Sequence, residues 1–130
     1  MVGATSARAT LMQCFVDPPV IYLYRGYVDF RKSINGLVAI VEQELNRSAF
    51  DPALYLFSNR AHDKVKILYW DTTGFALWYK RLEKHRFKWP KAVSGDLANQ
   101  ELHIDEQQLH WLLSGYDIIG HERLYFSSAC

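Results

Sequence analysis

Runs of apolar residues along the chain predict strands, and two stretches with helical periodicity lie between them. Four runs are rich in β-branched and aromatic residues, as strands usually are: Val20 to Tyr24, Ala53 to Phe57, Val65 to Trp70 and Phe75 to Leu82. A shorter run, Leu102 to Ile104, predicts one more strand. The last three of the four longer runs follow one another closely, so we expect them to form an antiparallel meander.

Two helices are expected between and after these strands. In the first, apolar residues recur at helical spacing from Asp29, the predicted N-cap, through to Asn46. In the second, Asp105 and Gln108 have the spacing of a capping box, and Gly115 ends the helix. The sequence therefore predicts an α+β fold, with a mostly antiparallel sheet (a central meander of three strands plus edge strands) and two principal helices.

One domain accounts for most of the chain. The chain has 130 residues, 49% of them apolar, which is enough to bury a core. We expect an irregular N-terminal arm over residues 1–19, a single α+β domain over residues 20–119, and a C-terminal tail or edge strand over residues 120–130. No continuous apolar stretch precedes Asp17, and no apolar run approaches membrane-spanning length. We therefore expect no signal peptide and a cytoplasmic protein without a membrane partner.

Apolar, aromatic and basic residues are densest between Lys64 and Pro90, where the sequence predicts a β-hairpin. We predict a three-residue loop, Thr72-Thr73-Gly74, whose last residue takes a left-handed conformation. The resulting register pairs Asp71 with Phe75, Tyr69 with Leu77, Leu68 with Trp78, Ile67 with Tyr79 and Lys66 with Lys80.

In that register, two lysines lie opposite each other beside Trp70 and Trp78 on one face of the hairpin. Like charges placed in this way disfavour a sheet unless solvent, a carboxylate or a bound anion such as phosphate relieves them. Two interpretations stay open. Either the lysine stems cover the tryptophans beneath a packed helix, or the face is open to nucleic acid or to a protein partner.

The net charge of +1 conceals a strong segregation along the chain. Residues 1–57 are balanced, residues 58–92 hold nine basic against three acidic residues, and residues 93–130 hold one basic against six acidic residues. A basic centre of this kind favours a polyanionic partner. Arg31 and Lys32, near the expected helix start, either extend such an anion site or are simply solvated. Phe87 and Trp89 either stack on bases or fill the edge of the core.

No pattern of catalytic or metal-binding residues stands out. The histidines are scattered, Cys14 and Cys130 lie near opposite ends of the chain, and glycine-rich phosphate loops are missing. Asp29, Asp63 and Asp71 could converge on a metal, but each has a simpler role as a cap or turn residue. We therefore expect no enzymatic activity, no catalytic residue, no metal, no cofactor and no small-molecule substrate.

Several motifs together resemble one known family. They are Arg25 to Lys32, Asn35 to Leu37, Asp63 to Asp71, Gly74-Phe75, Tyr79 to Glu83, Phe87 to Pro90 and Leu112 to Gly115. Across roughly residues 20–119, the chain is similar to the small accessory protein, called TnpB, of the insertion-sequence-sixty-six group, which is unrelated to the RNA-guided nuclease of that name. The resemblance implies a bacterial mobile-element protein that assists DNA transposition beside a separate, larger transposase.

These observations lead to one functional hypothesis and one alternative. The hypothesis is that cations bind the phosphates of the insertion-sequence ends, at Arg31, Lys32, Lys64, Lys66, Lys80, Arg81, Lys84, Arg86 and Lys88. The alternative is a module that docks the transposase or another accessory subunit of the same element without touching DNA. For stacking or docking we expect the aromatic residues Trp70, Trp78 and Trp89.

Overall fold

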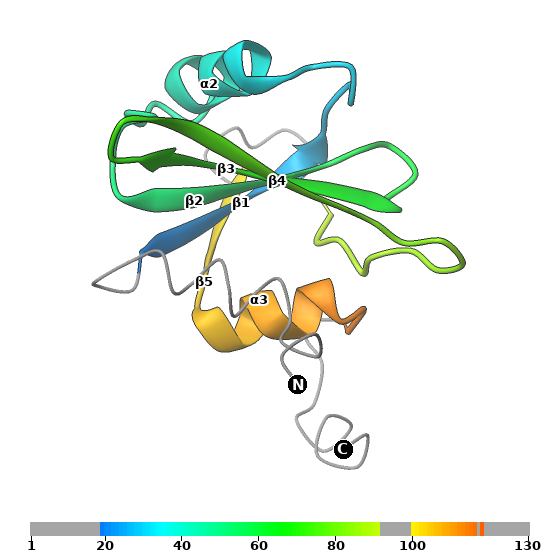
Figure 1. The fold of residues 1–130 in the computed structure, drawn as a ribbon. Helices are drawn as coiled ribbons and strands as arrows, with labels where there is room; N and C mark the ends of the chain where they lie inside the picture. The colour runs from blue at the N-terminus through cyan, green and yellow to red at the C-terminus, as the bar shows by residue number, and fades with distance from the viewer. Residues whose placement is uncertain (1–18, 92–99, 117, 119–130) are drawn as a thin grey trace, which may run out of the picture.

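The computed structural model describes residues 19–91, 100–116 and 118, which form a sheet between two helices (Figure 1). The sheet has five strands in the order β4-β3-β2-β1-β5. In chain order the elements are β1 (Val20–Tyr27), α2 (Ile34–Gln43), β2 (Ala53–Ser58), β3 (Lys64–Asp71), β4 (Gly74–Arg81), β5 (Glu101–Ile104) and α3 (Glu106–Leu113). The α+β prediction, with its mostly antiparallel sheet and two helices, is confirmed.

The central meander is also confirmed, while the pairing of β1 adds a feature that was not predicted. β2, β3 and β4 are antiparallel neighbours, and β5 runs antiparallel to β1. β1 and β2 are parallel, because α2 connects them and returns the chain to the same end of the sheet. β1 also extends through Arg25-Gly26, beyond the predicted run of Val20 to Tyr24, and its register shifts between Leu23 and Tyr27.

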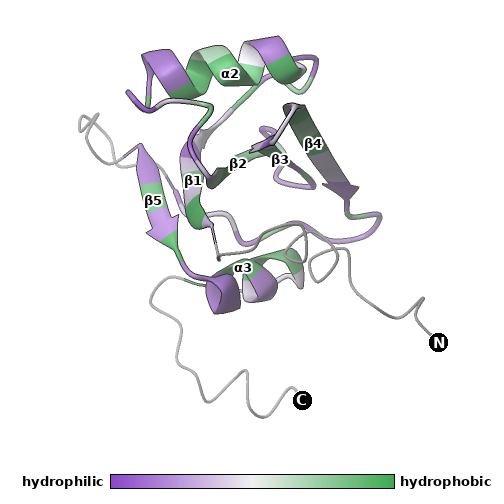
Figure 2. Ribbon diagram, turned by 60° about the vertical axis from the view of Figure 1, so that its left-hand side comes forward, coloured by the Kyte–Doolittle hydropathy of each residue, from purple (hydrophilic) through white to green (hydrophobic). Residues whose placement is uncertain are grey.

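One face of the sheet packs against α2, the upper helix in Figure 2. Leu37, Ile40 and Val41 are the buried residues of this helix. Their spacing places them on one stripe of the helix, as the periodicity predicted. On the sheet they meet the buried residues Tyr24, Ala53, Tyr55, Phe57 and Leu68, with Phe75 and Leu77 at the periphery.

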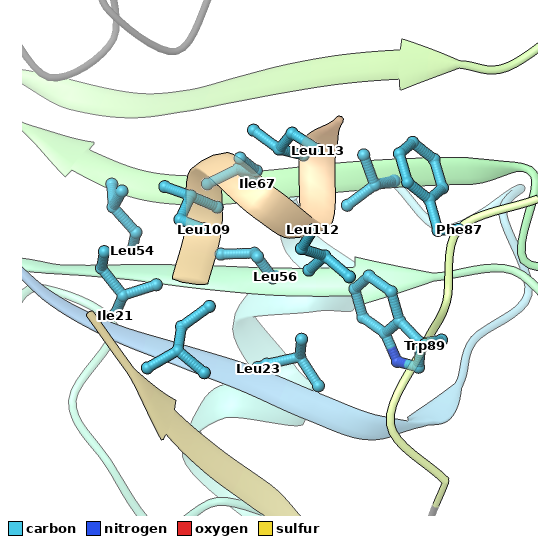
Figure 3. Close-up of a cluster of buried hydrophobic side chains, with 12 residues drawn as sticks. Ile21, Leu23, Leu54, Leu56, Ile67, Phe87, Trp89, Leu109, Leu112 and Leu113 are labelled. Carbon is cyan, nitrogen blue, oxygen red and sulfur yellow. The ribbon is translucent and has the colours of Figure 1, made fainter. Parts of the chain in front are cut away.

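The other face packs against α3, which crosses the strands with three buried leucines (Figure 3). Leu109, Leu112 and Leu113 belong to one cluster of buried residues. The segment after β4 adds Phe87 and Trp89, which are both buried. On the sheet this cluster contains Ile21, Leu23, Leu54, Leu56, Val65, Ile67 and Ile104. The sheet therefore has two cores, one under each helix.

The predicted register of the hairpin is wrong by one residue. Asp71 pairs with Gly74, so the loop has two residues, Thr72 and Thr73, and Gly74 is the first residue of β4. Thr72, not Gly74, has the left-handed backbone, with φ +50°. The observed pairs are Trp70 with Phe75, Tyr69 with Ala76, Leu68 with Leu77, Ile67 with Trp78, Lys66 with Tyr79 and Val65 with Lys80.

This slip moves every side chain of β4 to the other face relative to β3. Lys66 and Trp70 lie on the α2 face, while Lys80 and Trp78 lie on the α3 face. The predicted face with two opposed lysines beside two tryptophans therefore does not exist. The physical reason is that both faces are covered, so Leu77 fits the core under α2 and Trp78 packs against the core under α3.

The first helix starts later than predicted, and Asp29 is not its N-cap. The N-cap is Ser33, and α2 ends at Gln43, before Asn46, whose φ of +54° is not helical. The Asp29 carboxylate instead accepts hydrogen bonds from the backbone N–H and the guanidinium of Arg31. The amine of Lys66 binds the carbonyl groups of Phe30 and Lys32, which a longer helix would use as acceptors of its own backbone hydrogen bonds.

The second helix matches its prediction closely. Asp105 and Gln108 form a reciprocal capping box, with bonds of 2.7 and 3.0 Å. Gly115 has φ +94°, and the backbone bonds that follow Leu113 close the helix in a Schellman arrangement. The amine of Lys80 also donates to the Leu113 carbonyl, at 3.1 Å.

Some predictions lie outside the described residues. They concern the N-terminal arm before residue 19 and the C-terminal tail or edge strand over residues 120–130. The division into an arm, a domain and a tail stays a prediction.

Candidate nucleic-acid interface

Six basic side chains gather at the end of the hairpin that is opposite its turn, and we call this set the basic end. They come from the β2–β3 loop, the first residue of β3, the last residue of β4 and the segment after it. All are exposed except Lys64, which is partly exposed. The basic end consists of Arg60, Lys64, Arg81, Lys84, Arg86 and Lys88.

Backbone hydrogen bonds hold these segments together. Lys64 and Arg81 are directly opposite each other across β3 and β4. Beyond them, the Leu82 N–H donates to the Asp63 carbonyl at 2.8 Å, and the Phe87 N–H donates to the His62 carbonyl at 2.7 Å. The segment that carries Lys84, Arg86 and Lys88 is thus fastened to the β2–β3 loop.

Buried side chains anchor the same segment. Phe87 and Trp89 fill the core under α3, and the Trp89 indole N–H donates to the Tyr24 carbonyl at 2.9 Å. Alternating residues of an extended segment point in opposite directions. Arg86 and Lys88 accordingly remain exposed while the aromatic residues between and after them are buried.

Two carboxylates lie beside the basic end, and both accept hydrogen bonds from neighbouring side chains. Glu83 accepts from Arg81 at 2.8 Å on the surface. Asp63 accepts from the Asn59 amide at 2.7 Å, and this bond, with the charges of Lys64 and Arg86, lowers the pKa of Asp63. Six cations against two carboxylates leave this end strongly positive.

The pKa of the His62 imidazole is affected by the positive charge in this region. Burial lowers the pKa of His62, and the positive charge of Arg86 lowers it further. Both effects disfavour a protonated ring. At neutral pH His62 is therefore uncharged, and its ring lies 6.3 Å from that of Trp89.

Lys66 and Lys80, which were predicted to bind phosphates, each donate hydrogen bonds to backbone carbonyls. Lys66 is only 7% exposed, and its amine donates to the carbonyls of Phe30 at 2.9 Å and Lys32 at 2.8 Å. Burial lowers the pKa of its ammonium, while the carbonyls and the Phe30 ring, 4.6 Å away, favour the charge. The amine of Lys80 is bound to the end of α3.

Arg31 and Lys32 lie beside the basic end rather than in the first turn of a helix. Phe30 packs against Tyr79, with ring centroids 6.0 Å apart, which holds this loop over β3 and β4. Arg31 is paired with Asp29, and the pair lowers the pKa of that carboxyl to about 2. Lys32 is exposed, and its stem lies close over Gly36.

The three predicted tryptophans do not form one surface, because two of them belong to the core under α3. Trp89 is buried, Trp78 packs against the core under α3, and Trp70 lies on the α2 face. Trp70 belongs to a cluster with Phe50 and Phe75, which we call the aromatic cluster, with ring centroids 4.9 to 5.2 Å apart. Phe50 is 55% exposed, so this cluster offers an aromatic surface at the turn end of the hairpin.

Sequence reasoning left Arg60 and Phe50 out of the candidate site. Arg60 belongs to the basic stretch of the sequence, and its guanidinium lies 5.9 Å from the Tyr27 ring. The excess of basic residues in positions 58–92 therefore gave a reason to include Arg60 in the candidate site. Phe50 has no such signal, because only the tertiary fold carries the loop after α2 to the hairpin turn.

A cavity of about 290 Å³ lies between the end of β1 and α2. Its lining includes Tyr24, Tyr27, Lys32 and Glu44, and the Tyr24 hydroxyl donates to Glu44 at 3.0 Å. Burial and this bond raise the pKa of Tyr24 to about 12. The hydroxyl is therefore unsuited to act as a base near neutral pH.

The three aspartates that could have met around a metal each have separate surroundings. Asp29 is bound by Arg31, Asp63 by Asn59, and Asp71 closes the hairpin turn. Within the described ranges, no three histidine, cysteine or acidic residues are grouped as metal ligands would be. None of the described helices has the length and apolar character needed to cross a membrane.

Comparison with known proteins gives a family match and two relatives. Residues 19–123 match the sequence model of a family described as IS66 Orf2 like protein. The uncharacterized protein y4hO of Sinorhizobium fredii (strain NBRC 101917 / NGR234) is 33% identical over 97 residues, which cover 75% of this chain and 80% of the relative. The uncharacterized protein y4jC of the same strain is 32% identical over 90 residues, covering 69% and 73%. No solved structure matches.

Replacing Lys66 with methionine should destabilise the fold. Lys66→Met keeps most of the stem but leaves the carbonyls of Phe30 and Lys32 without their donor. We expect a loss of about 2 kcal/mol in the free energy of unfolding, measured by denaturant titration. The control, Lys64→Met, changes a partly exposed cation and should stay within about 0.5 kcal/mol. Equal stability of the two variants would contradict the role of Lys66.

Removing the charge of Arg86 should change the titration of His62. In Arg86→Gln we expect the pKa of His62 to rise toward its ordinary value of 6.5, because a nearby positive charge is gone. An NMR titration of the imidazole measures this change. Lys84→Gln removes a cation from the same segment without acting on His62, and should leave its pKa unchanged. A similar response to both variants would show that Arg86 is not beside the ring.

Proposed function

This chain belongs to the IS66 Orf2-like family, and from this premise we propose that it is a non-catalytic accessory factor in transposition that binds DNA through the basic end. The family suggests an accessory role in the movement of an insertion sequence. The bond-breaking chemistry then belongs to a separate transposase. The contribution of this protein is to hold the DNA of the element ends.

The observation that carries this proposal is the gathering of six cations at one end of the hairpin. They come from segments that are 28 positions apart at their extremes, and the fold fastens these segments to each other. Both carboxylates of this end are occupied by neighbouring side chains. A strongly positive, exposed surface of this kind attracts a phosphate backbone.

The geometry favours contact with the backbone over readout of bases. The cations lie on loops and strand ends, and α2 and α3 bury their apolar stripes against the sheet. Phosphate contacts position a protein on a duplex but carry little sequence information. We therefore propose binding that is tight at low salt and depends weakly on sequence, with Arg31 and Lys32 extending the contact.

DNA binding should weaken steeply with salt. If all six cations meet phosphates, the logarithm of the binding constant should fall with the logarithm of salt concentration with a slope of about −5, as measured by fluorescence anisotropy on element-end duplexes. The variant Lys84→Ala, Arg86→Ala, Lys88→Ala should lose about three units of that slope, because three contacts are gone.

A matched control keeps the charge at the same positions. The variant Lys84→Arg, Arg86→Lys, Lys88→Arg should bind DNA with the slope of the unchanged protein. A flat salt response, or no binding by the isolated protein, would remove DNA as a direct partner.

A second candidate function is docking of the transposase through the aromatic cluster. Phe50 leaves more than half of its surface exposed while its ring packs on Trp70 and Phe75. Exposed aromatic groups of this kind are common anchors of protein interfaces. This cluster lies at the turn end of the hairpin, away from the basic end, so a protein partner there would leave the cations free for DNA.

Shortening Phe50 should weaken this docking. With the transposase of the same element as bait, we expect Phe50→Ala to reduce the affinity by at least about fivefold, measured by quantitative co-purification. Val20→Ala removes another exposed apolar side chain, 40% exposed, outside the cluster and should have no effect. Equal retention of both variants would exclude the aromatic cluster as the docking site.

A further inference from the structure

β4 forms an edge of the sheet with unusually little protection. It pairs with β3 over eight consecutive residue pairs without a bulge, and no strand lies on its other side in the described part of the chain. Each of its residues is at least partly exposed. Figure 2 shows a hydrophobic stretch in β4, followed by a hydrophilic end. An exposed edge strand of eight residues without a bulge is a template for pairing with another strand.

The usual devices that block such an edge are missing from β4. The strand contains no proline, and its two cations are engaged elsewhere. The amine of Lys80 is bound to the Leu113 carbonyl, and the guanidinium of Arg81 to Glu83. Natural sheets commonly keep lysines on an edge to prevent pairing, but here Lys80 is drawn under the sheet by α3.

The backbone groups that face outward can be identified from the ladder. The Leu82 N–H donates to the Asp63 carbonyl, so the residues at even positions turn their backbone groups toward β3. Because this direction alternates along a strand, the N–H and carbonyl groups of Phe75, Leu77, Tyr79 and Arg81 point to the free edge.

The distribution of charge along β4 selects the partner. At one end β4 has Phe75 of the aromatic cluster, and at the other end it has Arg81, where the rest of the basic end follows. A parallel copy would bring cations next to cations. An antiparallel copy places Arg81 of each chain near Phe75 of the other on the same face of the sheet, which is favourable.

We propose that β4 pairs with β4 of a second copy of this chain, antiparallel and about a two-fold axis. The strand is self-complementary in this orientation, as an interface between identical subunits requires. The sheets of the two copies then become one continuous sheet, and the outward backbone groups of Phe75, Leu77, Tyr79 and Arg81 gain partners. The pairing uses backbone hydrogen bonds, as in other cases of strand addition.

A pair of variants at Leu77 tests this proposal. Both Leu77→Ala and Leu77→Pro remove the side chain, but only proline removes the outward N–H. Analytical ultracentrifugation at micromolar concentrations should give twice the chain mass of 15.1 kDa for the unchanged protein and for Leu77→Ala. Leu77→Pro should give the single-chain mass while keeping its helical and strand content by circular dichroism.

Hydrogen exchange on the unchanged protein gives a second test that does not depend on folding of the proline variant. The amides of Phe75, Leu77, Tyr79 and Arg81 should exchange at least about tenfold more slowly at high than at low protein concentration. A single-chain mass with rapid exchange at these amides would overturn the proposal, because the edge of β4 would then be unpaired in the isolated protein. A single-chain mass with slow exchange at every concentration would also overturn it, because a segment of the same chain would then cover the edge.

Discussion

Both faces of the central sheet are covered by a helix, and this constraint determines the position of nearly every side chain in the hairpin. Each strand residue must fit the core under α2, fit the core under α3, or lie at an end of the sheet. Trp78 satisfies the second condition and Leu77 the first only in the observed register. Thr72 accepts a left-handed backbone in return, at a cost of about 1 kcal/mol. Burial of two apolar side chains outweighs a cost of that size.

The same constraint gives the two central lysines a structural role. Lys66 and Lys80 lie on opposite faces, and each reaches the covering segment on its own side. Lys66 binds two carbonyls ahead of α2, and Lys80 binds a carbonyl at the C-terminus of α3, where the helix dipole favours a positive charge. Lys66 and Lys80 thus attach the loop before α2 and the end of α3 to the sheet, while the cations of the basic end face solvent.

This arrangement separates three surfaces on one small sheet. The basic end presents cations, the aromatic cluster presents rings at the opposite end of the hairpin, and the edge of β4 connects the two. An accessory protein in transposition that contacts DNA, a transposase and a second copy of itself would need such separate surfaces. None of the three requires movement of the two cores.

The sequence by itself determined the features that depend on neighbouring residues. The cap of α3 follows from Asp105 and Gln108, the stop from Gly115, and the buried β2 from an uninterrupted apolar run. Only the tertiary structure decided the hairpin register, the start of α2 and the place of Phe50. In each case the deciding contact comes from a distant segment: α3 against β4, Lys66 against the loop before α2, and Trp70 against Phe50. Alternation along a strand shows which residues share a face, but it cannot show which face is covered when both are.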